Sequence, residues 1–444
     1  SCFVAKNYEK PQFETEDLYR AEIVAKDTVS MADMSWEELF KDPILKGYIR
    51  KGLQNNFDIR TAMQNIVAAE ASLKQQKTGY LPIISANGSW THQEISGNSQ
   101  FGNFFDRLDQ YQLAANLSWE ADIWGKIRSS KRAANAQYLQ TIAANQAVKT
   151  QVITGISSVY YQLLALDAQL IIAEQTLENR SKSIETILAL KDAGQVTEVA
   201  VKQTEAQKFA TEIIIQDLKY NITILENTMS ILLGEVSQKI ERSTFEDQDL
   251  NPEIKTGVPA SLLSKRPDVI AAEYSLVNAF ELVNVSRSNF YPSFTITAAG
   301  GFQSLELKEL ISTNSIFANI VTGLTQPVFN QRQIRTQHEI AKANQERALI
   351  LFEQALKTAG KEVSDALADY ENETTKISIR TQQVEALKKA SEYSEELLAY
   401  GLANYLEVLT AKDNALNSEL SLIDNRFRQF NSIITLYRAL GGGW

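Results

Sequence analysis

Residues 111–122, YQLAANLSWEAD, have the alternating pattern of a β-strand in a chain that otherwise has a helical pattern. Apolar residues fall at every second position, with polar residues between them and only the small Ala114 out of step. The alternating apolar residues are Tyr111, Leu113, Ala115, Leu117 and Trp119. A period of two is typical of a strand with one buried face. The question is what a few strands in a long helical chain pair with.

The composition suits long helices and argues against some classes of function. The 444 residues include only 19 Gly and 8 Pro, the two residues that most often interrupt helices. A formal net charge of -10 argues against nucleic-acid binding, because phosphates require a basic surface. No run of about 20 apolar residues occurs, so we expect no single helix to cross a membrane.

Cys2 is the only cysteine, so it has no partner for a disulfide within the chain. It follows Ser1, and Ser is common before the lipid-modified cysteine of bacterial lipoproteins. We therefore expect Cys2 to carry a thioether-linked lipid, whose chains favour membrane binding by about 0.8 kcal/mol per buried methylene. The alternative is an ordinary terminal thiol.

Three intervals between matching residues recur in the two halves of the chain. The pairs are Asp58 to Pro82 and Asp268 to Pro292, 24 apart; Arg128 to Gly194 and Arg335 to Gly401, 66 apart; and Gly194 to Gly234 and Gly401 to Gly441, 40 apart. Only the Pro-to-Arg interval differs, at 46 and 43 residues. The spacing predicts a tandem duplication with repeats at 38–240 and 258–444. The N-terminal segment 1–37 and the linker 241–257 then form a collar.

Each repeat is expected to contain a helix, two strands, a long helix and a returning helix. The long helices are predicted at 126–192 and 331–399, and 66 residues of helix span about 100 Å. The returning helices are predicted at 197–233 and 404–440. The 24-residue and 40-residue intervals together nearly equal 66, so two shorter helices placed end to end would flank each long helix.

The predicted strands lie at 82–95, 110–121, 292–302 and 316–328. Alternating strands of about ten residues that contain tryptophan suit a membrane-spanning barrel. Four strands cannot close, and open edges are not tolerated in lipid. Three copies of the chain would supply twelve strands, above the minimum of about eight for a barrel. The alternative is a small soluble sheet that caps a helical bundle.

Several motifs together resemble the outer-membrane channels of bacterial tripartite efflux pumps, the TolC superfamily, in its lipoprotein branch. These motifs are LLSKRPDVIAAE (262–273), WEADIWGKIRS (119–129), VYYQLLALDAQLIIAEQTLENR (159–180), GLANYLEVLTA (401–411) and YRALGGGW (437–444). The resemblance implies a mainly α homotrimer whose shared twelve-stranded barrel, four strands per chain, continues into a helical periplasmic tunnel. It also implies outer-membrane lipid, a periplasmic adaptor protein and an inner-membrane transporter of the RND type as partners.

The resemblance places the narrow periplasmic aperture near the turns at Gly194 and Gly401. Glu407 stands where relatives usually carry Asp facing the pore, and three copies would form a negative ring that favours cations. Glu198 is the nearest acidic substitute in the first repeat, where relatives often have an acid at position 200, here Ala. Tyr405 and Leu402 are candidates for an apolar constriction, although Tyr405 could equally face a neighbouring helix.

The same turns are the expected docking surface for the adaptor. The residues concerned are Gly194, Gln195, Val196, Thr197, Gly401, Ala403 and Asn404. Their short, mixed side chains suit a weak contact repeated around a ring, where multivalency raises the affinity.

The sequence offers no catalytic residues, metal ligands or cofactor site. His92 and His338 are far apart in sequence with no acidic or cysteine cluster beside either, so we expect surface or pore-lining roles. The chain is therefore predicted to be a passive exit duct for small molecules such as drugs, toxic compounds or metal ions. A duct for secreted polypeptides and a soluble helical scaffold remain as alternatives.

Overall fold

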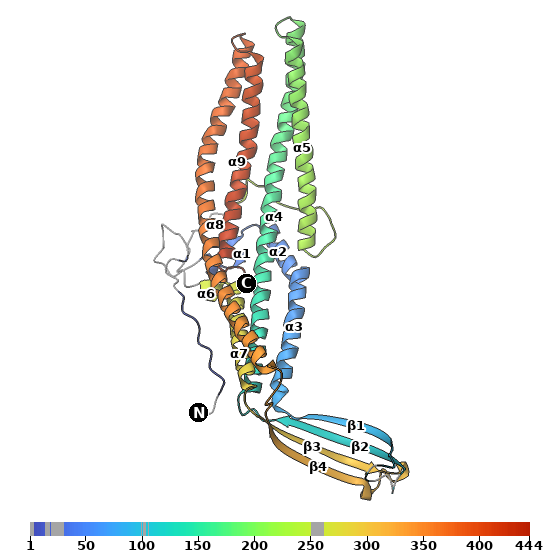
Figure 1. The fold of residues 1–444 in the computed structure, drawn as a ribbon. Coiled ribbons are helices and arrows are strands. Elements are labelled where there is room, and N and C mark those ends of the chain that lie inside the picture. Colours follow the sequence, from blue (N-terminus) through green and yellow to red (C-terminus); the bar gives the residue numbers. More distant parts are fainter. Residues whose placement is uncertain are drawn as a thin grey trace. The chain divides into compact units, whose positions relative to one another are not determined.

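The computed structural model describes residues 4–13, 18, 31–98, 100, 104, 106–249 and 262–444. Cys2 lies outside these residues, as do parts of the predicted N-terminal segment and of the collar linker. The described part is mainly helical and contains one four-stranded sheet (Figure 1).

The two halves of the chain contain the same order of long elements. The first half has α1 (Trp36–Leu39), α2 (Pro43–Asn55), α3 (Phe57–Lys77), β1 (Ile83–Glu94), β2 (Arg107–Glu120), α4 (Lys126–Asp192) and α5 (Glu198–Leu232). The second has α6 (Leu262–Lys265), α7 (Pro267–Ser288), β3 (Ser293–Ser304), β4 (Ile316–Thr325), α8 (Gln333–Ala399) and α9 (Tyr405–Ala439). Short 3₁₀ turns lie at Met31–Asp33, Thr78–Tyr80, Leu307–Glu309 and Thr313–Ser315. The helices α4 and α8 each have 67 residues, and α5 and α9 each have 35, which is what a duplication predicts.

The chain divides into two compact units, and each unit takes segments from both halves of the sequence. Unit 1 comprises Ser1–Gln12, Asn65–Thr141 and Ala272–Phe352, and it holds the sheet. Unit 2 comprises Phe13–Gln64, Ile142–Ala271 and Glu353–Trp444, and it holds the turns at Gly194 and Gly401.

The helical segment before the first strand of each repeat is broken, where the spacing predicted one helix. In the first repeat the break falls at Asn56, whose Oδ1 accepts hydrogen bonds from the N–H groups of Asp58 (2.9 Å) and Ile59 (3.2 Å) and so caps α3. In the second, Pro267 begins α7, since its missing N–H is tolerated only in the first turn of a helix.

The end of β4 also differs from the prediction, because the strand stops at Thr325 and not at 328. Pro327 cannot donate a hydrogen bond to a neighbouring strand. Gln331 and Arg332 then adopt left-handed φ angles of 52° and 67°, so the helix α8 begins at Gln333.

One helix of the described part, α4, contains an 18-residue stretch apolar enough to cross a membrane by length and composition, contrary to our expectation. Half of that stretch is buried within the chain. Core helices meet the same criterion, and Ile156 and Leu163 of α4 are completely buried.

The sheet is antiparallel throughout, in the order β1-β2-β3-β4, so the two halves of the chain meet where β2 pairs with β3. Its register separates an apolar face from a polar face, because side chains alternate along a strand. The apolar face includes Ile84, Trp90, Leu113, Leu117, Trp119, Phe294, Ile296, Phe302, Ile316, Ile320 and Leu324, with His92, Glu94, Arg107 and Asp109 of β1 and β2 as ionisable exceptions. The polar face includes Ser85, Asn87, Ser89, Thr91, Gln93, Gln110, Gln112, Asn116, Ser118, Glu120, Thr295, Thr297, Gln303 and Asn319, with Ile83, Leu108, Phe317 and Val321 as large apolar exceptions.

Four glycines end the long and returning helices in the same way. Gly194, Gly234, Gly401 and Gly441 have φ angles of 74°, 73°, 69° and 93°. In each case the glycine N–H and the next N–H turn back to the last helical carbonyls, as in Gln195 N to Leu190 O (2.9 Å) and Leu402 N to Leu397 O (2.9 Å). This is the Schellman motif, which favours glycine because its left-handed conformation is strained for other residues.

Gly234 and Gly441 have a second requirement, because each lies against the backbone of a helix junction. A Cβ atom on Gly234 would lie 2.5 Å from the carbonyl oxygen of Asn55, and one on Gly441 would lie 2.6 Å from that of Lys265. The next residue of each junction donates a side-chain hydrogen bond to the last carbonyl of the returning helix. These bonds run from Asn56 to Leu232 O (2.9 Å) and from Arg266 to Ala439 O (3.1 Å).

These glycines predict two classes of alanine variant. Gly194→Ala and Gly401→Ala meet open space and should cost about 1 kcal/mol for the left-handed backbone alone. Gly234→Ala and Gly441→Ala must also move a neighbouring backbone, and we expect a loss of about 3 kcal/mol or more. Thermal and denaturant unfolding of the four variants measures the difference, and equal destabilisation in all four would contradict the assignment.

Candidate functional site

The two turns of unit 2 expose most of the residues predicted to dock a partner. Five of them are exposed, namely Gly194, Gln195, Thr197, Gly401 and Asn404, whereas Val196 and Ala403 are half-buried. Val196 packs against an apolar cluster below the turns. The Asn404 side chain caps α9 by accepting a hydrogen bond from Leu406 N (3.1 Å), so it also has a structural role.

The four residues predicted to line an aperture lie in different environments. Glu407 is exposed in the first turn of α9, and Leu402 is 75% exposed. Glu198 forms an ion pair with Lys191 (2.9 Å), and this hydrogen-bonded lysine lowers the pKa of the Glu198 carboxyl.

The helices α4 and α5 form one helical hairpin, and α8 and α9 form the other. Tyr405 is only 8% exposed and packs between these two hairpins. With Ile187, Val201 and Leu409 it forms the apolar cluster below the turns. Its hydroxyl is hydrogen-bonded to that of Thr204 at 2.9 Å, and burial raises the pKa of the phenol. Of the two possibilities left open for Tyr405, contact with a neighbouring helix is therefore the one that the structure shows.

Buried Arg180 is a second link between the hairpins, and the sequence analysis missed it. Arg180 of α4 donates to Thr211 Oγ1 of α5 (2.6 Å) and pairs with Asp413 of α9. One signal was present, because Arg180 follows Ala173 and Leu177 at helical spacing on the apolar stripe of α4. A charged residue on a buried stripe requires a partner.

A groove of 810 Å³ opens beside the turns, between α4, α8 and α9. Its wall combines apolar groups with several charged residues, and Gln195 of the first turn lies at its edge. The charged residues that line it are Arg180, Lys182, Lys388, Glu392, Glu395, Lys412 and Glu419. Lys412 pairs with Glu395 and donates to Ser183 Oγ (3.2 Å), which ties α9 to both long helices.

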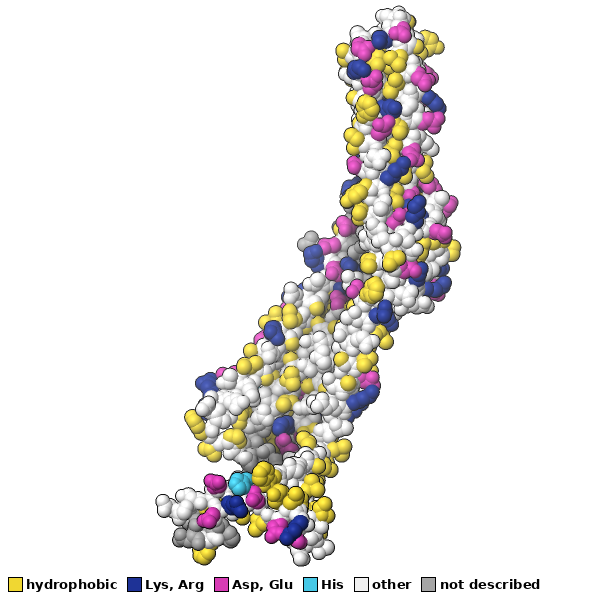
Figure 2. Space-filling model, turned by 90° about the vertical axis from the view of Figure 1, so that its right-hand side faces the viewer, with side chains coloured by type: hydrophobic (Ala, Val, Ile, Leu, Met, Phe, Trp, Pro, Cys, Tyr) yellow, Lys and Arg dark blue, Asp and Glu magenta, His cyan; other side chains and the backbone are white. Residues whose placement is uncertain are grey.

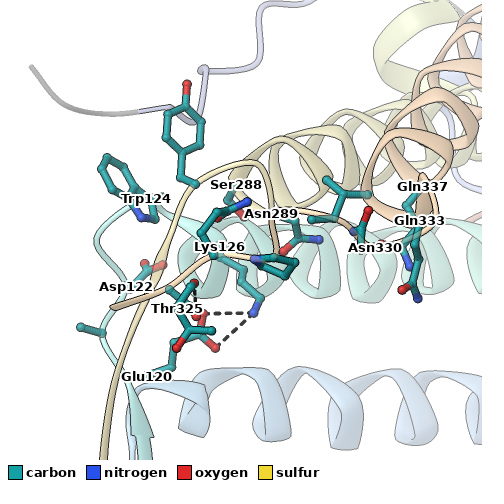
Figure 3. A pocket seen from close by; sticks show the side chains of 16 residues that line it. Glu120, Asp122, Trp124, Lys126, Ser288, Asn289, Thr325, Asn330, Gln333 and Gln337 are labelled. Atoms are coloured by element: carbon teal, nitrogen blue, oxygen red, sulfur yellow. Dashed lines mark hydrogen bonds and ion pairs between the residues drawn. The ribbon is translucent and has the colours of Figure 1, made fainter. Parts of the chain in front are cut away.

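In unit 1, a polar pocket of 300 Å³ lies where the sheet gives way to the helices (Figure 3). Glu120, the last residue of β2, holds the ammonium of Lys126 at 3.0 and 3.1 Å from its two carboxylate oxygens. Asp122 caps α4 by accepting from Ile127 N (2.8 Å) and Arg128 N (3.1 Å). Amide side chains complete the wall, among them Asn289, Gln326, Asn330, Gln333 and Gln337.

Aromatic residues flank the apolar face of the sheet at both ends of its strands. At the helix end, Trp119 donates to Tyr80 O (2.8 Å), and Trp124 stacks on Tyr291 with ring centres 4.9 Å apart. Toward the other end, the rings of Trp90 and Tyr111 are stacked, with their centres 6.5 Å apart.

The histidines lie apart from each other in polar pairs. His92 Nδ1 is 2.8 Å from Asp109 Oδ1, and His338 Nδ1 is 2.9 Å from Ser286 Oγ. Within the described ranges, no group of three or more His, Cys, Asp or Glu residues is arranged to hold a metal ion.

Comparison with known proteins gives consistent matches over the whole chain. A family model described as outer membrane efflux protein matches residues 48–235 and 258–442. The cation efflux system protein CusC of Escherichia coli O6:H1 is 27% identical over 449 residues, covering 100% of this chain and 96% of CusC. The solvent efflux pump outer membrane protein SrpC of Pseudomonas putida is also 27% identical, over 454 residues and the same shares of the two chains.

Solved structures agree with these matches. A membrane protein from Pseudomonas aeruginosa superposes with a TM-score of 0.92 at 25% identity, over 100% of this chain and 98% of that one. A crystal structure of CusC gives a TM-score of 0.87 at 25% identity, with 99% of both chains covered.

The contact between Tyr405 and Thr204 predicts a local stability effect near the turns. Tyr405→Phe and Thr204→Val should each speed amide hydrogen exchange around residues 400–412, and a double-mutant cycle should give a coupling of about 1 kcal/mol. Thr381→Val is the control, since Thr381 is exposed on α8 and its hydroxyl donates within its own helix to Ile377 O (2.8 Å). Additive effects of the two changes would contradict a direct link.

Proposed function

Because the chain belongs to the outer membrane efflux protein family, we propose that it is the outer-membrane exit duct of a tripartite efflux system. In this proposal it passively conducts small molecules delivered by a periplasmic adaptor and an inner-membrane transporter. Its relatives are named for cation efflux and for solvent efflux, which are very different cargoes. That difference supports a duct whose cargo is selected by its partners.

The observation that carries the proposal is a sheet with an apolar face, a polar face and two unpaired edges. Since β1 and β4 are the edge strands, their outer N–H and C=O groups lack sheet partners among the described residues. Lipid cannot satisfy such groups, so the edges must pair with other copies. Three copies would place twelve strands in a closed barrel, with apolar side chains toward lipid and polar ones toward water. Trp119 and Trp90 would then lie near the two membrane surfaces.

Exposed apolar residues on α5 and α8 support contact between the helices of neighbouring copies of the chain. The buried face of α5 packs inside the chain, yet a second apolar stripe on the same helix is exposed, with spacings of four and seven residues (Figure 2). This α5 stripe consists of Phe209, Ile213, Tyr220, Ile224 and Ile231. On α8, the exposed residues Ile379, Ala386, Ala390, Tyr393 and Leu397 repeat at similar intervals. Such spacing suits coiled-coil contact between neighbouring copies, and it supports a continuous helical tunnel.

The turns of unit 2 are proposed as the periplasmic aperture and the adaptor docking surface. Exposed Glu407 would form a ring of three carboxylates, and exposed Leu402 would add an apolar group beside it. The links from Tyr405 to Thr204 and from Arg180 to Asp413 hold the hairpins together, so they favour the closed arrangement. Docking would use the exposed turn residues and the adjoining groove.

The proposed lipid anchor on Cys2 is supported by the contacts that Val4 and Lys6 make with α7. Asn284 of α7 binds the backbone of Lys6 twice, accepting from its N–H (3.1 Å) and donating to its carbonyl (2.9 Å). Arg287, in the last turn of α7, donates to Val4 O (3.4 Å). The helix α7 leads directly into β3, so residue 4 lies close to the proposed membrane surface, where a lipid on Cys2 would insert.

Adjacent cysteine variants on opposite faces of β2 test the proposed barrel. Ser118→Cys lies on the polar face and Leu117→Cys on the apolar face. In planar bilayers, a charged, water-soluble thiol reagent should reduce the current through Ser118→Cys and leave Leu117→Cys unchanged. An equal response of both variants, or no ion current from the inserted protein, would reject the duct.

The proposed ring at the aperture predicts a change in selectivity. Glu407→Gln removes three carboxylates from the narrowest point, so we expect higher conductance or a weaker preference for cations. Glu205→Gln is a matched control, because Glu205 is paired with Lys202 (2.8 Å) on α5. Identical single-channel records for Glu407→Gln and the control would place Glu407 outside the ion path.

A further inference from the structure

The polar face of the sheet is almost free of charge. All residues of the four strands are described, and among those on the polar face Glu120 is the only one with an ionisable charge. The other members are Ser, Thr, Asn, Gln, Gly, Ala and a few larger apolar residues. Asn116 even donates to Asn87 across the face (2.6 Å), as neutral amides do. The charged strand residues His92, Glu94, Arg107 and Asp109 share the opposite face.

Glu120 itself is neutralised by one neighbouring lysine. Lys126 Nζ lies 3.0 and 3.1 Å from the two carboxylate oxygens. Figure 3 shows this pair at the wall of the polar pocket of unit 1. Lys126 begins α4, and its backbone is held in place by the Asp122 cap and by the turn at Gly125, whose φ is 79°. The other charged group on the pocket wall, the Asp122 carboxylate, accepts hydrogen bonds from Ile127 N and Arg128 N, and the amide groups of the wall carry no charge.

The pair is partly exposed, with side-chain exposures of 41% for Lys126 and 35% for Glu120. Ion pairs of this kind stabilise a fold by about 0–1 kcal/mol, so stability alone is a weak reason for it. Its electrostatic effect is larger, because three unpaired carboxylates around one opening would attract cations and repel anions.

We propose that Lys126 is a specificity-determining residue that cancels the lumen charge of Glu120 and keeps the barrel wall neutral to solutes of either charge. This inference rests on the proposed duct, in which the polar face lines the lumen. In this proposal the membrane-spanning barrel admits both cations and anions, and any selection by charge takes place in other parts of the duct.

Reversal potentials in a KCl gradient test this role. At an ionic strength of about 0.05 M, where screening is weak, Lys126→Gln should raise the K⁺ to Cl⁻ permeability ratio about twofold or more. Glu120→Gln leaves the ammonium unpaired and should lower the ratio. The double variant should return it to the wild-type value. Lys131→Gln, which changes another exposed lysine of α4, is the matched control and should have little effect.

The thermal stability of the assembled protein provides a check on folding, and the double variant separates charge from structural damage. If wild-type protein conducts and Lys126→Gln shifts the ratio no more than Lys131→Gln, the inference is wrong while the duct stands. Failure of the double variant to restore the ratio would also overturn it. If correctly inserted wild-type protein conducts no ions, the proposed duct is wrong, and the inference fails with it.

Discussion

The unpaired outer edges of β1 and β4 are the constraint on which the rest of the account depends. A backbone N–H or C=O group left without a hydrogen bond in hydrocarbon costs several kcal/mol, and two strand edges present a row of them. The apolar face of the same sheet makes exposure to lipid favourable. In the proposed barrel, further copies of the chain continue the sheet until it closes, and this meets both requirements. The proposed trimer and tunnel follow from this closure, and the exposed α5 stripe is consistent with it.

The lengths of the long and returning helices depend on a different constraint, the position of the residue that ends each helix. Four glycines with left-handed φ angles end α4, α5, α8 and α9, so the two long helices have equal lengths and the two returning helices have equal lengths. Gly234 and Gly441 also admit the close approach of Asn55 and Lys265, which joins each returning helix to the start of its own repeat. The turns at Gly194 and Gly401 meet no such neighbour and remain available for contacts with other molecules.

Much of the fold could be predicted because its signals are local. The bounds 126–192 follow from a helical pattern that ends one residue before the Ala193–Gly194 turn, and the alternation around Leu113 and Leu117 marks β2. Features that depend on packing between distant segments were not predictable in this way. The orientation of Tyr405 depends on how two hairpins meet, and the pairing of Arg180 with Asp413 joins residues 233 positions apart. The break at Asn56 was missed although its capping residue is visible in the sequence, because the spacing fixed only the length of the segment before the strand and not its division into helices.

The mass of the particle extracted from outer membranes in mild detergent tests the central claim most directly. Native mass spectrometry should give about three times the chain mass of 49.7 kDa, with the edges β1 and β4 protected from amide hydrogen exchange. A monodisperse single-chain particle that stays soluble in aqueous buffer without detergent, with both edges equally protected, would contradict the account.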